Sequence, residues 1–102
     1  MTTEFIWTVR FNRKANKEFN KLDRPVQKKI STYISNQLIC NQNPRQFGHS
    51  LKGKLKEFWR FRAGDYRLIC YIEDAKKNIR IMHVGHRKDV YDIDSLDFPD
   101  VE

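Results

Sequence analysis

The hydrophobic pattern of this sequence changes from helical spacing to alternation partway along the chain. Apolar side chains recur at helical spacing in residues 13–38, whereas residues 55–85 contain three runs that alternate or are nearly continuously apolar. A further alternating run, FIWTVRF, occupies residues 5–11. The pattern therefore predicts the order strand, helix, helix, strand, strand, strand.

The helical part divides in two at Asp23-Arg24-Pro25. Asn12 can cap a first helix over residues 13–22. Proline disfavours helical geometry in the residue before it and suits the first turn of a helix that follows. The second helix begins there and ends before the turn-forming residues 41–44. Its apolar stripe consists of Val26, Ile30, Tyr33, Ile34 and Leu38. Two helices joined by a tight break form a helical hairpin.

The three later strands are expected over residues 55–61, 66–72 and 78–85. The segments between them are short enough to connect adjacent antiparallel strands. A four-stranded sheet with both helices on one face would bury both apolar surfaces. The sequence thus predicts an α+β fold with an N-terminal strand, a helical hairpin and a three-stranded antiparallel meander. We assign one domain to residues 1–91, followed by an acidic tail at 92–102.

Positive charge is concentrated in the predicted domain. The chain has 20 Lys and Arg and 13 Asp and Glu, and residues 92–102 contain five of the acids and no base. Residues 1–91 therefore carry a net charge of +12. Such a body suits an anionic polymer such as nucleic acid, although many basic surfaces only increase solubility.

Other features of the sequence favour a cytoplasmic protein without a cofactor. No apolar run approaches the ~20 residues of a membrane-spanning helix, and the N-terminus lacks the parts of a secretory signal. Cys40 and Cys70 lie far apart and outside any CxxC spacing. We expect them to be free thiols and do not expect a structural metal site.

Three arginines are expected to meet on the open face of the sheet. Alternation places Trp59 and Phe61 toward the core and Arg60 and Arg62 on the other side. A turn with an even number of residues would bring Arg67 opposite Arg60 or Arg62. Like charges facing across a strand pair destabilise a sheet by ~0.2–1 kcal/mol. An anion is therefore the natural partner, and the alternative is that each arginine extends into solvent or pairs with an acid.

The stretch VGHRKDVY at residues 84–91 closes the last strand with groups that handle protons or phosphate. His86 has the side chain whose ordinary pKa suits a general acid or base. Arg87 is expected where the sheet stops, and Tyr91 on a turn or short helix beyond it. A surface histidine and a tyrosine covering the sheet edge are the alternatives. His83, within the apolar strand, is expected to be packed rather than catalytic.

Two motifs carry a family resemblance. W-R-x-R-x-G-x-Y-R at residues 59–67 and G-H-R-x-D-V-Y at 85–91, together with the LKG at 51–53 and the order of elements, resemble the RelE/ParE superfamily of bacterial toxins. The resemblance covers nearly all of residues 4–91 and is greater to the RelE branch. It implies the RelE-like fold, a cognate antitoxin as partner, and a ribosome-dependent endoribonuclease that cuts messenger RNA in the A site without a metal. ParE-type toxins instead inhibit DNA gyrase.

The resemblance also implies roles for single residues. Arg67 matches an arginine that contacts the scissile phosphate, and Arg87 matches a second phosphate arginine. Arg60 stands where RelE has a catalytic lysine, so the positive charge is kept but proton transfer is not. Tyr91 matches a terminal tyrosine that orients the nucleophile, stacks or transfers a proton.

One position departs from the RelE pattern. Phe58 falls where RelE has another catalytic lysine, so a general base is missing there. Three explanations stay open: His86 supplies proton transfer, Phe58 stacks on a base while the ribosome positions the substrate, or the chain is a weakened enzyme. Candidate RNA-binding residues are Lys52, Lys54, Lys56, Phe58 and Arg62. The competing functions are a gyrase inhibitor and a plain basic RNA-binding module.

Overall fold

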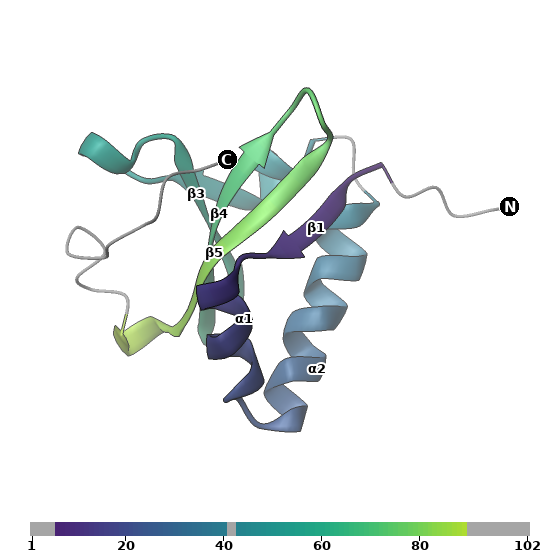
Figure 1. Cartoon of the computed structure of the whole chain (residues 1–102), viewed down its shortest axis with the longest axis vertical. Helices are drawn as coiled ribbons and strands as arrows, with labels where there is room; N and C mark the ends of the chain where they lie inside the picture. Colours follow the sequence, from purple (N-terminus) through teal and green to yellow (C-terminus); the bar gives the residue numbers. More distant parts are fainter. Residues whose placement is uncertain (1–5, 41–42, 90–102) are drawn as a thin grey trace, which may run out of the picture.

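The fold is a five-stranded sheet with two helices on one face (Figure 1). The computed structural model describes residues 6–40 and 43–89. The elements are β1 (Thr8–Phe11), α1 (Arg13–Asn20), α2 (Arg24–Tyr33), β2 (Gly48–Ser50), β3 (Phe58–Ala63), β4 (Tyr66–Glu73) and β5 (Asn78–His86). A π-helical segment, Ile34–Ile39, continues α2, and 3₁₀ turns occupy Pro44–Phe47, Gly53–Leu55 and Arg87–Asp89.

The sheet has one strand more than the sequence predicted. Its order is β1-β5-β4-β3-β2, with β1 parallel to β5 and the other neighbours antiparallel. The α+β class, the helical hairpin and the three-stranded meander are confirmed. The prediction of four strands was wrong, because β2 is only three residues long and its sequence, GHS, has no apolar alternation.

Local signals set the start of each helix. The Asn12 side chain accepts a hydrogen bond from the backbone N–H of Ala15 at 2.7 Å, which confirms the predicted cap. Pro25 lies in the first turn of α2, where its missing N–H leaves no partner unsatisfied. The run at residues 55–61 forms a strand only from Phe58, since Gly53–Leu55 make a 3₁₀ turn.

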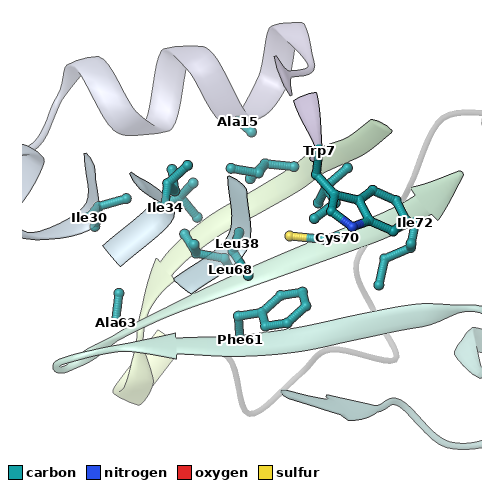
Figure 2. Close-up of a cluster of buried hydrophobic side chains, with 13 residues drawn as sticks. Trp7, Ala15, Ile30, Ile34, Leu38, Phe61, Ala63, Leu68, Cys70 and Ile72 are labelled. Atoms are coloured by element: carbon teal, nitrogen blue, oxygen red, sulfur yellow. The ribbon is translucent and has the colours of Figure 1, made fainter. Parts of the chain in front are cut away.

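The main core lies between the helices and the sheet (Figure 2). Figure 2 shows side chains from both layers meeting there, among them Ile30 and Leu38 from the helical side and Phe61 and Leu68 from the sheet. Cys70 belongs to this core, and burial raises the pKa of its thiol. Cys70 and the half-buried Cys40 are both free, as the sequence predicted.

A smaller apolar cluster lies on the opposite face of the sheet. It consists of Leu51, Phe58, Ile69 and Met82. These side chains come from β3, β4, β5 and the segment after β2. The face without helices is therefore divided between this cluster and the arginines of β3 and β4. No helix within the described residues is long and apolar enough to cross a membrane.

A carboxylate from α1 satisfies the edge of β5 that β1 leaves unpaired. Glu18 accepts a hydrogen bond from the backbone N–H of Val84 at 3.0 Å. Its other oxygen lies 2.8 Å from His83 Nδ1 and 2.8 Å from Lys14 Nζ. His83 is thus packed at the α1–β5 contact, as the sequence predicted.

Replacing Glu18 by alanine should lower the free energy of unfolding by about 1–3 kcal/mol, because a partly buried N–H and the His83 ring would lose their acceptor. Urea denaturation followed by circular dichroism measures the effect. Lys17→Ala, at an exposed position of the same helix, is the control and should change the free energy by no more than about 0.5 kcal/mol. Equal midpoints for the two variants would contradict a structural role for the carboxylate.

Candidate functional site

The β3–β4 hairpin brings the predicted arginines together. Its turn consists of two residues, Gly64 and Asp65, and Gly64 has the positive φ of 64° that such a turn requires of one residue. With this even-numbered turn, Arg62 lies directly opposite Arg67. Alternation along β3 places Arg60 on the same face. The predicted convergence of these three residues is confirmed.

The arginines line a cavity on the face that carries no helix. It has a volume of about 380 Å³ and is lined by Phe47, His49, Arg60, Arg62 and Arg67. Three strands and the 3₁₀ turn before β2 supply these residues. Within the described residues the lining therefore has three guanidinium groups, one imidazole and no carboxylate.

Burial and the neighbouring positive charges both act on Arg67. Burial lowers the pKa of its guanidinium, and the charges of Arg62, Arg60 and Arg87 lower it further, while Asp65 acts in the opposite direction. Among the described residues, the Nη1 atom of Arg67 is out of contact with solvent and has no hydrogen-bond partner. The cavity beside it is lined by three guanidinium groups and is therefore suited to an anion that supplies acceptor oxygens.

Arg87 lies at the end of β5, close to the same hairpin. Its backbone N–H donates a hydrogen bond to the carbonyl of Asp65 at 2.7 Å, which ties the 3₁₀ turn after β5 to the β3–β4 turn. The Arg87 side chain is exposed, and its charge acts on Arg67. Tyr91 and the acidic tail at 92–102 lie outside the described residues.

His86 does not join the arginine cavity. It pairs with Tyr66 across β4 and β5, and the two rings meet edge to face with centroids 5.3 Å apart. Tyr66 packs against the core on the helix side of the sheet, so the imidazole lies on the opposite face from Arg67. The strand alternation that places Arg67 on the open face thus excludes His86 from it, contrary to the sequence-based assignment.

The remaining RNA-binding candidates lie apart from this cavity. Phe58 is buried in the smaller apolar cluster, with its ring centroid 6.1 Å from that of Tyr71, so its ring does not present a free face for stacking. Three exposed lysines lie in and around the 3₁₀ turn before β3, at the end of that strand remote from the β3–β4 turn: Lys52, Lys54 and Lys56. They do not line the cavity.

The sequence analysis missed two residues of the cavity, Phe47 and His49. Both lie between the predicted second helix and the strand predicted from residue 55, where the sequence analysis assigned no helix or strand; the structure forms a 3₁₀ turn and the edge strand β2 there. The sequence signal that could have indicated them is Gly48, which precedes His49 and lies close before LKG. A glycine in a strand often marks a close approach of another backbone. In the described part of the chain, no cluster of three or more His, Cys, Asp or Glu side chains is placed to hold a metal ion.

Comparison with known proteins identifies the family of this chain. Residues 9–91 match the family described as the ParE toxin of the type II toxin-antitoxin system parDE. Toxin RelG of Mycobacterium tuberculosis is 29% identical over 85 residues, which are 83% of this chain and 95% of that protein.

Solved structures of related toxins have the same fold. The crystal structure of the toxin-antitoxin complex RelBE2 from Mycobacterium tuberculosis matches with a TM-score of 0.74 and 28% identity, over 83% of this chain and 95% of that one. The intact RelBE complex of Escherichia coli matches with a TM-score of 0.63 and 24% identity, over 78% and 95% of the two chains. The chain therefore belongs to the RelE/ParE superfamily of toxins of type II toxin-antitoxin modules.

Proposed function

We propose that this toxin is a ribosome-dependent endoribonuclease that cleaves messenger RNA in the A site and so stops translation. The observation that carries the proposal is the cavity lined by Arg60, Arg62 and Arg67, which within the described residues has three guanidinium groups and no carboxylate. Guanidinium groups offer planar pairs of donors that match phosphate oxygens. A phosphodiester is the anionic group that such a cavity suits and that a translating ribosome presents.

The reaction that fits these residues is attack of the ribose 2′-hydroxyl on the adjacent phosphate. It produces a 2′,3′-cyclic phosphate and a 5′-hydroxyl, and its transition state carries more negative charge on phosphorus oxygens than the substrate does. Arg67 is placed to stabilise that charge, with Arg60 and Arg62 beside it. Arg87, whose charge acts on Arg67, adds a fourth positive charge. The ribosome supplies the bent conformation of the messenger that attack requires.

The toxin works in the cytoplasm and has an antitoxin as its partner. Related toxins have been crystallised in complex with antitoxins, as in RelBE2 and RelBE. The net charge of +12 on residues 1–91 suits an acidic segment of such a partner. Covering the arginine cavity would block the proposed reaction.

Inhibition of DNA gyrase is the second candidate function. It is favoured by the family match, which is to ParE toxins, and by Phe58, which the resemblance to RelE places at the position of a catalytic lysine. A gyrase inhibitor acts by binding and needs no proton transfer. The cavity would then serve only as part of a basic contact surface.

A single preparation of the protein separates the two functions. Added to a translating extract, the toxin should generate new messenger 5′ ends at A-site codons, mapped by primer extension, and should leave gyrase supercoiling of a relaxed plasmid unchanged. Cleavage should also weaken as salt rises, because phosphate contacts release counterions. Intact messenger together with inhibited supercoiling would replace the first function by the second. If the toxin neither cleaves messenger nor inhibits supercoiling, RNA binding alone would remain.

A further inference from the structure

The fifth strand places a histidine in the arginine cavity. β2 pairs antiparallel with β3, and His49 lies directly opposite Arg60. Directly opposed residues of an antiparallel pair point to the same face, with Cβ atoms about 4.5–5.5 Å apart. The His49 side chain is exposed and lines the 380 Å³ cavity together with the three arginines.

A glycine holds this histidine close to the arginines. A Cβ atom at Gly48 would lie 2.6 Å from the Arg60 carbonyl oxygen and 2.8 Å from a ring carbon of Phe61. Phe61 is fully buried and Arg60 is in the middle of β3, so neither can move aside cheaply. Only glycine lets β2 approach β3 this closely, and the next residue, His49, is thereby fixed above the cavity.

The other described residues that line the cavity have no side chain that can accept a proton. Arginine stays protonated at all physiological pH values, and phenylalanine has no ionisable group. The charged groups that face His49 are Arg60 and Arg62 from β3 and Arg67 from β4, while β2 itself contributes none. Among the described residues that line the cavity, His49 is therefore the one whose neutral side chain can take up a proton.

We propose that His49 is the general base of the cleavage reaction, a role that rests on the endoribonuclease function proposed above. The neutral imidazole takes the proton of the 2′-hydroxyl while the 2′-oxygen forms its bond to phosphorus. The bond between phosphorus and the 5′-oxygen breaks, and that oxygen takes a proton from water. Loss of the imidazolium proton to solvent returns the enzyme to its starting state. His49 thus does the work of the lysine that Phe58 replaces.

A base and a phosphate-binding cation make opposite demands on the imidazole. A general base must be neutral, so the cleavage rate should rise with pH over the range in which histidine loses its proton. A group that only holds phosphate must be charged, so its contribution should fall over the same range. Arginine at position 49 could replace the second role but not the first.

The test uses preformed ribosome–messenger complexes and saturating toxin, with single-turnover cleavage measured across pH 5–8 at constant salt. The wild type should show a rate that rises with pH and then levels off. His49→Ala and His49→Arg should both cut about 10²–10⁴-fold more slowly and lose the rising limb. Added imidazole should restore part of the rate of His49→Ala. Thermal unfolding of each variant establishes that it folds.

Three results would overturn this assignment while leaving the endoribonuclease intact. They are a rising limb that persists in His49→Ala, a wild-type rate in His49→Arg, and loss of the limb in His86→Ala instead. The third result would assign the role of general base to His86, on the other face of the sheet. A wild-type toxin that cuts no messenger at any pH would overturn the proposed function and the assignment together.

Discussion

Replacing Arg67 by alanine should slow messenger cleavage by about 10²–10³-fold without making the protein less stable. The loss follows because Arg67 is the least exposed of the three arginines that line the cavity. Its guanidinium group can stabilise the negative charge that develops on the reacting phosphate. Primer extension in a translating extract, quantified over time, measures this loss.

The stability of Arg67→Ala should be equal to that of the wild type or higher by up to about 1 kcal/mol. Arg67 lies directly opposite Arg62, and the charges of Arg62, Arg60 and Arg87 disfavour its ionised form. Removing it relieves this repulsion and also removes a buried donor without a partner. Urea denaturation followed by circular dichroism gives the free energy of unfolding.

Arg24→Ala is the matched control for both measurements. It removes the same side chain and the same unit charge from an exposed position at the start of α2, on the other side of the sheet. It should retain cleavage within a few-fold, since only the general attraction to RNA is reduced. Equal losses in the two variants would show that net charge, and not the cavity, accounts for activity.

Replacing Phe61 by alanine should have the largest effect on stability, lowering the free energy of unfolding by about 3–5 kcal/mol. The ring is fully buried between the sheet and the helices (Figure 2). Its removal leaves a cavity that β2 and β3 cannot close, because their backbones already approach each other at Gly48. Since small domains are stable by only about 5–15 kcal/mol, a large part of the protein would be unfolded near 37 °C.

The urea midpoint and the thermal midpoint of Phe61→Ala should therefore both fall well below those of the wild type. Thr32→Ala, at an exposed position on α2, provides the baseline and should remain within about 0.5 kcal/mol. A loss below about 1 kcal/mol in Phe61→Ala would mean that the core around β3 collapses readily into the space left by the ring. The close approach of β2 to β3 at Gly48 would then not prevent that collapse.

Strand alternation was sufficient to predict the arginine half of the site. Trp59 and Phe61 fix which face of β3 is buried, and a two-residue turn then determines the position of Arg67. The same rule excludes His86, because it stands opposite Tyr66 on the buried side. Applying alternation through β5 as well as β3 would have corrected that assignment from the sequence.

The histidine half of the site could not be predicted in this way. β2 has three residues, and none of them belongs to a core cluster, so no hydrophobic pattern marks it. The strand exists because its backbone groups pair with those of β3, and backbone pairing leaves no trace in composition. What the sequence does contain is Gly48, whose necessity becomes visible only beside the ring of Phe61.

The repulsion between arginines of the β3–β4 hairpin affects how easily such a toxin loses its activity by mutation. Losing Arg62 or Arg67 relieves a local electrostatic conflict. A cell in which a mutation of either of these two codons inactivates the toxin would still accumulate a folded, harmless protein. Disarmed alleles should therefore arise more readily at this hairpin than in the buried core.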